Sequence, residues 1–313
     1  MAARKTAFIG LGVMGYPMAG HQRSAGHDVR VYNRSTAKAA KWTREHKGRS
    51  ARTPALAARG AEIVCLCVGD DDDVRSVVYG KDGVLAGMAE GSILIDHSTG
   101  SAELARELAE ACGQRGVGFL DAPVSGGQMG AENGRLAIMV GGKAAHYKKA
   151  RVVMDAYAKA VNLMGPAGCG QLTKMVNQIC ILGVVQSLSE GINFAKRAGL
   201  DPFQVIEVVS EGAARSFQMD MRAKTMIEGK FNFGFAVDLM RKDIGICLDE
   251  ANRNGAPLPI TAIIDQFYKD IQVNGGGRLD NTALVKRLYD MPGARSSMPK
   301  PAMEKSAAKK APA

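Results

Sequence analysis

Runs of apolar and β-branched residues alternate with helix-like segments over the first 142 positions of the chain. Between the runs, Leu104, Leu108 and Cys112 recur at helical spacing, and residues 16–25 and 37–44 also have a helical pattern. Such alternation predicts a mostly parallel sheet covered by helices. The predicted strands span residues 6–10, 28–33, 63–68, 92–96, 118–122 and 136–141.

The pattern changes after Gly165 and Pro166, because no strand is predicted beyond this point. One long proline-free helix is predicted over residues 171–198, and shorter ones over 202–209, 235–252 and 261–273. We therefore expect an α/β chain with an N-terminal Rossmann-type doubly wound sheet and an all-α C-terminal domain that begins with a long interdomain helix. The expected divisions are residues 1–165, 166–292 and a basic disordered tail, 293–313.

Composition narrows the class of protein. The chain has 313 residues, of which 46% are hydrophobic and 23% charged, so it can bury a sizeable core and is long enough for two domains. It has no apolar run long enough for a membrane span and no secretory signal pattern, so we expect a cytoplasmic protein. The apolar faces of the predicted helices indicate a homodimer or homotetramer.

The net charge of +10 raises the question of nucleic-acid binding. Part of the excess positive charge lies in the tail, which contains four lysines and one glutamate. The sequence has no basic motif interleaved with aromatic residues that would support nucleic-acid binding. Anionic small molecules, such as a cofactor phosphate or a carboxylate-bearing substrate, suit the remaining charge. The six cysteines include no C-x-x-C pair and no histidine cluster at ligand spacing, so we predict no metal site.

A glycine-rich segment follows the first predicted strand directly and opens the first predicted helix. In a dinucleotide-binding turn, the first glycine permits the tight turn, the second allows the pyrophosphate close to the backbone, and the third lets helix and strand pack closely. The positive helix N-terminus also favours phosphate. We therefore predict cofactor contacts from Gly10, Leu11, Gly12, Val13, Met14 and Gly15.

The second predicted strand ends in Asn33, Arg34 and Ser35, where a site specific for NAD usually has an acidic residue on the ribose hydroxyls. Because that acid is missing and a guanidinium offers several donors to a 2′-phosphate, we predict NADP as the preferred cofactor, with NAD as the alternative. The three residues are predicted to bind the cofactor. In the alternative interpretation, Arg34 is a solvated loop charge.

Five ordered segments together resemble the β-hydroxyacid dehydrogenases, the family of 3-hydroxyisobutyrate dehydrogenase and tartronate semialdehyde reductase. The resemblance covers roughly residues 5 to 290 and implies hydride transfer between a nicotinamide cofactor and a small β-hydroxy acid or semialdehyde. The segments are the glycine turn, residues 96–99, 121–127 and 168–178, and the pair Lys242 and Asp243.

Within this resemblance, Lys174 matches the lysine that acts as general acid and base on the substrate oxygen. Its place on a helix near Ile181 and Val185 implies a pKa lowered by desolvation. Asn177 and Gln178 lie three and four positions later, on the same helix face, and are predicted to bind the substrate, one of them holding the substrate hydroxyl or the lysine. The loop with Ser125, Gly126 and Gly127 matches the family's substrate-anchoring loop, and its N–H groups and hydroxyl can converge on a carboxylate.

Other positions match family residues at the cofactor site and the substrate pocket. Thr99 matches a residue near the nicotinamide ribose and can also cap a helix. Lys242 matches a residue that closes over the cofactor, with Asp243 orienting it, and Phe235 is predicted to wall the substrate pocket. Val68 is predicted to contact the cofactor, although the chain departs from the family where Gly69 and four aspartates follow it. For His97 the sequence leaves two interpretations open, a titrating role and a packed or loop histidine.

Three alternatives compete with this interpretation. Imine reductases share the architecture, but related sequences usually have Asp or Tyr where this chain has Lys174. Phosphogluconate-type decarboxylating dehydrogenases carry a much larger helical domain. A non-catalytic dinucleotide-binding module with a nucleic-acid-binding tail tends to lose the lysine that this chain retains.

Overall fold

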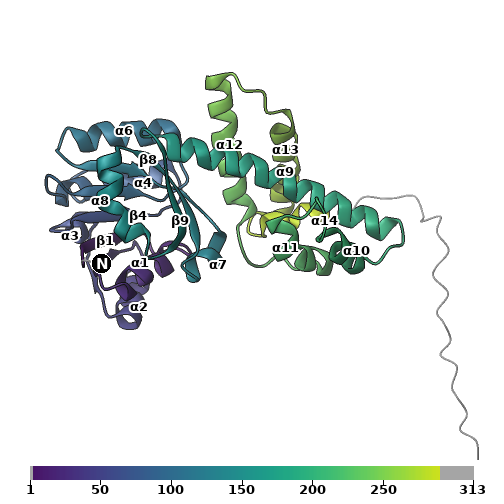
Figure 1. Cartoon of the computed structure of the whole chain (residues 1–313), viewed down its shortest axis with the longest axis horizontal. Helices are drawn as coiled ribbons and strands as arrows, with labels where there is room; N and C mark the ends of the chain where they lie inside the picture. Colours follow the sequence, from purple (N-terminus) through teal and green to yellow (C-terminus); the bar gives the residue numbers. More distant parts are fainter. Residues whose placement is uncertain (1–2, 290–313) are drawn as a thin grey trace, which may run out of the picture.

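A computed structural model describes residues 3–289 (Figure 1). The predicted tail, residues 293–313, and the end of the predicted all-α segment lie outside the described residues. Within them, one sheet occupies the N-terminal half and a group of helices the C-terminal half, so the expected fold class is confirmed. Figure 1 shows helix α9 crossing from one half into the other.

The sheet has the strand order β3-β2-β1-β4-β5-β6-β8-β7, with β9 paired to β8. Pairings from β3 through β6 are parallel, whereas β8 is antiparallel to both β6 and β7. The strands are β1 Lys5–Ile9, β2 Asp28–Tyr32, β3 Arg49–Ser50, β4 Ile63–Leu66, β5 Ile93–Asp96, β6 Gly118–Asp121, β7 Val124–Ser125, β8 Leu136–Gly142 and β9 Ala158–Gly165.

Helices cover both faces of this sheet, which explains why β1, β4, β5 and β6 are almost entirely buried. Phe8 packs on one face with Trp42 and Tyr157, while Ile9 packs on the other face with Leu104 and other aliphatic residues. The helices are α1 Gly15–Ser24, α2 Thr36–His46, α3 Pro54–Ala58, α4 Asp71–Val78, α5 Val84–Gly87, α6 Ala102–Gly113, α7 Gly127–Glu132 and α8 Ala144–Met154.

The C-terminal half is organised around α9, Cys169–Arg197, which packs against α11, α12, α13 and α14. By length and apolar composition alone, α9 would also pass as a membrane span, but 44% of its most apolar window is buried in the protein, as in a core helix. The other elements are α10 Pro202–Val209, α11 Phe217–Glu228, α12 Val237–Asn254, α13 Pro259–Ile271, the short turns Gln272–Gly276 and Asn281–Ala283, and α14 Leu284–Tyr289.

Several elements were not predicted from the sequence pattern, among them helices α4 and α8, strand β9 and helix α11. Strand β9 follows the last predicted strand, and helix α11 lies between two predicted helices. In β9 only Val161 is fully buried, so the strand has no continuous apolar run. In α11 only Met219, Ala223 and Met226 are buried, and charged residues surround them in the sequence. Tertiary pairing and packing therefore define β9 and α11.

The order of the strands reverses at β1, which creates a crevice between the two directions of winding. β1 pairs with β2 on one side and with β4 on the other, so the chain winds outwards from β1 in both directions. In open α/β sheets, ligands bind at the carboxyl ends of the strands at such a switch point. The glycine turn after β1 lies there.

Candidate active site

A cavity of about 960 Å³ extends from the glycine turn to the helices of the C-terminal half. One wall comes from the ends of β1, β2, β4 and β5 and from the loop around β7. The opposite wall comes from α9, α11 and α12 and from residues Gly234 and Phe235. A cavity of this size between two structural halves can hold a dinucleotide and a small substrate together.

The glycines of the turn have separate physical roles. Gly10 has φ +93°, and a Cβ there would lie 2.2 Å from the Cys67 carbonyl oxygen. A Cβ on Gly15 would lie 2.1 Å from the Gly10 carbonyl oxygen, so only glycine lets α1 pack this closely on β1. A Cβ on Gly12 meets nothing within 4 Å. The backbone at Gly12 is therefore open to a ligand.

The N-terminus of α1 favours an anion. No side chain caps this end of the helix, and its first turn contains no acidic residue. Its positive potential is thus available to a phosphate group that approaches over Gly12. These residues fit the pyrophosphate of a dinucleotide cofactor.

Asn33 shapes the turn from the neighbouring strand end. Its Oδ1 accepts a hydrogen bond from the Leu11 N–H at 2.9 Å, and its Nδ2 donates to the Ser35 carbonyl oxygen at 3.2 Å. Leu11 is 1% exposed and packs in the core. Alone among the predicted site residues, Leu11 does not line the cavity, because its side chain points into the sheet core and its N–H is bound to Asn33.

Basic residues surround the end of the cavity next to β2. The Arg34 side chain is 83% exposed and forms an ion pair with Asp73 at 3.4 Å. Ser35 caps α2 by accepting a hydrogen bond from the Lys38 N–H, and Lys38 also lines the cavity. This end therefore combines two exposed cationic groups with a helix N-terminus.

The acidic segment after Val68 has a structural explanation. Asp70 caps α4, and the Asp71 carboxylate accepts hydrogen bonds from the Ser101 N–H and hydroxyl. The Asp73 carboxylate accepts one from the Gly69 N–H. The Val68 N–H itself donates to Ser98 Oγ at 3.0 Å. These aspartates, which depart from the family pattern, therefore stabilise the start of α4 at the edge of the cavity.

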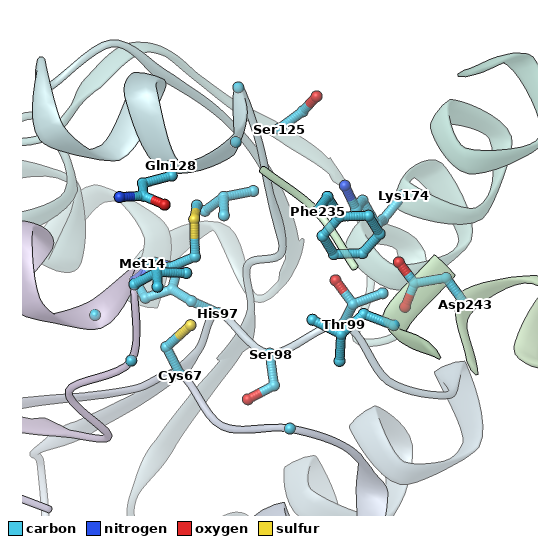
Figure 2. A pocket seen from close by; sticks show the side chains of 18 of the residues that line it. Met14, Cys67, His97, Ser98, Thr99, Ser125, Gln128, Lys174, Phe235 and Asp243 are labelled. Atoms are coloured by element: carbon cyan, nitrogen blue, oxygen red, sulfur yellow. The ribbon is translucent and has the colours of Figure 1, made fainter. Parts of the chain in front are cut away.

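Lys174 projects from α9 into the cavity next to the ring of Phe235, with Met14 and Gln128 across the cavity (Figure 2). It is 8% exposed, and its ammonium group forms no hydrogen bond or ion pair within residues 3–289. Burial lowers the pKa of Lys174 below its usual value, while nearby Asp243 opposes part of that shift. The sequence analysis predicted a lowered pKa for this lysine, in the same direction.

Asp121 fixes the start of α9 against the sheet. This buried residue at the end of β6 accepts hydrogen bonds from the Gly168 N–H at 2.8 Å and the Gln171 N–H at 2.9 Å. The Gln171 side chain in turn binds Gly100 and Ser98 on the adjacent loop. Lys174 follows less than one turn later, so its position is tied to the sheet.

A chain of polar contacts runs beside Lys174. The Ser125 hydroxyl donates to Asn177 Oδ1 at 3.1 Å, and Asn177 Nδ2 donates to Gln178 Oε1 at 2.8 Å. Gln178 Nε2 then donates to Asp243 Oδ2 at 2.5 Å. The loop after β6 is thereby connected through α9 to α12. Gly126 and Gly127 have φ +132° and +62°, so this loop needs glycine at both positions.

Lys242 connects α12 to the sheet. Its Nζ donates to the Gly69 carbonyl oxygen at 3.0 Å and to the Thr99 carbonyl oxygen at 2.6 Å. It also forms an ion pair with Asp243 Oδ1 at 3.0 Å. The predicted orienting role of Asp243 is consistent with this contact.

His97 is a packed residue. It is 2% exposed, one ring nitrogen lies 2.7 Å from the Ala122 carbonyl oxygen, and the other lies 2.8 Å from the Tyr157 hydroxyl. Burial lowers its pKa to about 4, so the ring is neutral near pH 7. Nδ1 then donates to Ala122, and Nε2 accepts from Tyr157.

The cavity brings together every predicted site residue except Leu11. These residues are Gly10, Gly12, Val13, Met14, Gly15, Asn33, Arg34, Ser35, Val68, Thr99, Ser125, Gly126, Gly127, Lys174, Asn177, Gln178, Phe235 and Lys242. Sequence reasoning missed several others that line it, among them Lys38, Gln128, Met221, Arg222, Leu239 and Asn281. Of these, only Lys38 carried a usable signal, since it lies one helical turn after Arg34.

Family models match both halves of the chain. One, described as the NAD binding domain of 6-phosphogluconate dehydrogenase, matches residues 5–165. Another, described as the NAD-binding part of NADP-dependent 3-hydroxyisobutyrate dehydrogenase, matches residues 168–288.

Whole-length relatives support the same assignment. An uncharacterized oxidoreductase of Shewanella frigidimarina is 57% identical, with 91% of this chain and 98% of the relative covered. The 2-hydroxy-3-oxopropionate reductase of Escherichia coli is 34% identical, with 91% and 97% covered. The crystal structure of 3-hydroxyisobutyrate dehydrogenase from Salmonella typhimurium has a TM-score of 0.82 at 28% identity, with 91% and 99% covered.

Imine reductases are more distant. The structure of the imine reductase from Pseudomonas sp. has a TM-score of 0.60 at 20% identity, with 91% of this chain and 99% of that chain covered, which is a likeness of fold alone. The glycine turn, the buried lysine and the two family matches therefore agree with one another. The chain is an NAD(P)-dependent oxidoreductase that belongs to the β-hydroxyacid dehydrogenase family.

Proposed function

We propose that the protein interconverts a small β-hydroxy acid and its semialdehyde, with Lys174 as the general acid and base and NADP as the preferred cofactor. One observation carries this proposal: the buried Lys174 amine, which has no partner among residues 3–289, lies in the same cavity as the glycine turn and the Ser125 loop. A buried cation that is left unpaired costs stability, so a role with a bound ligand explains its retention.

A nicotinamide held over the glycine turn would supply the hydride to the substrate carbon in reduction and take it up in oxidation. The Lys174 ammonium group donates its proton to the carbonyl oxygen, which becomes the hydroxyl of the product, and the lysine regains a proton from solvent. In oxidation, neutral Lys174 accepts the hydroxyl proton. The lowered pKa of Lys174 brings the two protonation states closer to balance near neutral pH.

The Ser125 loop is proposed to hold the substrate carboxylate. Gly126 and Gly127 have no side chains, so an anion can reach their backbone N–H groups without obstruction. The Ser125 hydroxyl can turn from Asn177 to the ligand. Asn177 and Gln178 are positioning residues, because their hydrogen bonds connect this loop to Asp243 beside Lys174. Phe235 is proposed to exclude water from the reacting atoms.

NADP preference is proposed from Arg34, Ser35 and Lys38. Arg34 is exposed and loosely paired, so it can turn to a 2′-phosphate, and Lys38 lies one helical turn away. We expect Arg34→Ala combined with Lys38→Ala to lower kcat/KM for NADPH by ~10-fold or more and to change that for NADH by much less. Arg44→Ala, on the same helix away from the cavity, is the control. Equal losses with both cofactors would contradict the assignment.

We further propose that residues 1–165 form the cofactor domain and residues 166–292 the substrate and oligomerisation domain of a cytoplasmic homodimer or homotetramer. The support is a set of exposed apolar side chains in the helical half, which include Phe194, Phe203 and Val208. Light scattering at increasing concentration tests the assembly, and a monomer at all concentrations would contradict it.

The activity itself is tested by a steady-state screen of short β-hydroxy acids, semialdehydes and cyclic imines, with NADPH and NADH and their oxidised forms. The proposal expects turnover of at least one carboxylate-bearing semialdehyde or hydroxy acid and none of the imines. Turnover of cyclic imines alone would favour the imine reductase alternative.

A further inference from the structure

The C-terminal half lines part of the cavity with residues that the proposed reaction does not use, and we call this part the chamber. Ile181 and Val184 of α9, Met221 of α11 and Leu239 of α12 give it apolar walls. Two polar side chains, Arg222 and Asn281, line the same chamber.

Asn281 is 6% exposed, yet its side-chain amide forms no hydrogen bond with any of the described residues. The amide atoms are not among those that are fully enclosed without a partner, so they reach the surface of the cavity. The backbone holds the residue firmly, since the Asn281 N–H donates to the Phe235 carbonyl oxygen at 2.8 Å. A buried amide left without a protein partner points to a ligand that supplies one.

Arg222 gives the chamber a positive charge. Its guanidinium carbon lies 4.9 Å from the centre of the Phe233 ring, and a Cβ built on Gly234 would lie 3.3 Å from its Nη2. It forms no ion pair with a carboxylate in residues 3–289, in contrast to neighbouring Arg215, which pairs with Asp220. A guanidinium that rests on an aromatic ring keeps its donors free for a planar anion.

Neighbouring groups do not neutralise Arg222 through a direct contact. Asp280 is the nearby buried acid, and its carboxylate is occupied by the Thr282 N–H and hydroxyl and by the Phe235 N–H. Ser216 and Gln218, at the start of α11, also line the cavity, but Ser216 caps this helix and Asp220 lies in its first turn, so its N-terminus is already compensated. The chamber therefore combines a cation with an amide that has no partner among the described residues.

We infer that this chamber binds a second carboxylate, so that the preferred substrates are β-hydroxy acids with an additional acidic side chain. The inference rests on the proposed function, because the first carboxylate is assigned to the Ser125 loop and the reacting oxygen to Lys174. Arg222 and Asn281 are then specificity-determining residues that contact the side chain of the substrate and not its reacting carbon.

Two substrates that differ only at this position test the inference. In 3-hydroxyisobutyrate the carbon next to the carboxylate carries a methyl group, and in 2-(hydroxymethyl)succinate that methyl group bears a second carboxylate. The wild-type enzyme with NADP⁺ is expected to have the higher kcat/KM for the dicarboxylate. Arg222→Met should reduce the ratio of dicarboxylate to monocarboxylate kcat/KM by ~10-fold or more.

Arg215→Met is the matched control, since Arg215 lies just before the same helix and does not line this cavity, and it should leave the ratio unchanged. Asn281→Leu, which keeps the volume and removes the amide, should lower the ratio in the same direction as Arg222→Met. Equal losses for both substrates in Arg222→Met, or a wild-type preference for the monocarboxylate, would overturn the inference while the proposed function stands.

A binding measurement separates the two proposals if neither compound is oxidised. In the presence of NADP⁺, 2-(hydroxymethyl)succinate should raise the unfolding temperature of the wild type more than that of Arg222→Met. A shift that depends on Arg222 without turnover would support the chamber and count against the proposed reaction. No shift in either protein would overturn the chamber assignment.

Discussion

Replacing Lys242 by Met tests how the two halves of the protein are held around the cavity. The change removes hydrogen bonds to the carbonyl oxygens of Gly69 and Thr99 and leaves Asp243, 2% exposed, without its cation. Hydrogen bonds from a charged donor contribute about 1.5–3 kcal/mol each, and breaking a buried ion pair costs about 3–5 kcal/mol.

These contributions overlap, and the Lys242 side chain is 24% exposed, so water replaces part of what is lost. We therefore expect a loss of about 2–4 kcal/mol in the free energy of unfolding. Adding Asp243→Asn should recover about 1–2 kcal/mol, because a neutral amide needs no cation and still accepts the hydrogen bond from Gln178.

Urea unfolding followed by circular dichroism measures both variants. Lys230→Met is the control, since Lys230 is exposed and an ion pair on the surface, such as that with Glu228, contributes little to stability. If Lys242→Met and Lys230→Met lose the same stability, or if Asp243→Asn adds a further loss to Lys242→Met, the proposed bridge between the halves is wrong.

Further predictions concern Lys174 and the glycine turn. Burial lowers the pKa of Lys174, and reduction needs the protonated form of this lysine. We therefore expect kcat/KM for reduction to fall, and kcat/KM for oxidation to rise, as the pH rises through a value below the usual lysine pKa. Parallel pH profiles in both directions would contradict this. Gly15→Ala should lower the unfolding temperature, because its methyl group would collide with Gly10 and Phe8. Gly12→Ala should leave that temperature unchanged, because its methyl group meets only open space. The same methyl group should raise the Kd for NADPH, measured by fluorescence titration, because the cofactor is expected to occupy that space. Unchanged cofactor affinity would count against the turn as the phosphate site.

The glycine turn and the long helix could be predicted because their signals are local. Gly10, Gly12 and Gly15 stand between an apolar strand and a helix, and their spacing alone dictates a close approach of backbone to ligand. Helix α9 has a sustained apolar pattern without proline, so its existence and the common face of Lys174 and Gln178 followed from periodicity. The predicted ends of the helices differ from those in the structure by a few residues where a cap, and not the apolar pattern, ends the helix.

Other features could not be predicted because they arise from packing between distant segments. Lys242 meets Gly69 and Thr99 across 173 and 143 residues of sequence, and only the docking of α12 on the sheet brings them together. Asn281 lies in a short turn whose place beside Phe235 depends on one backbone hydrogen bond. Strand β9 is recognisable only through its pairing with β8.

The central claim is that Lys174 transfers the proton to and from the substrate oxygen, and rapid mixing of wild type and Lys174→Met with NADPH and a semialdehyde tests it most directly. Because Lys174 has no protein partner within the described residues, its removal leaves no orphaned group, so folding and the Kd for NADPH should be preserved. The account predicts that the single-turnover rate of hydride transfer falls by ~10²-fold or more. Hydride transfer by Lys174→Met at the wild-type rate would contradict it.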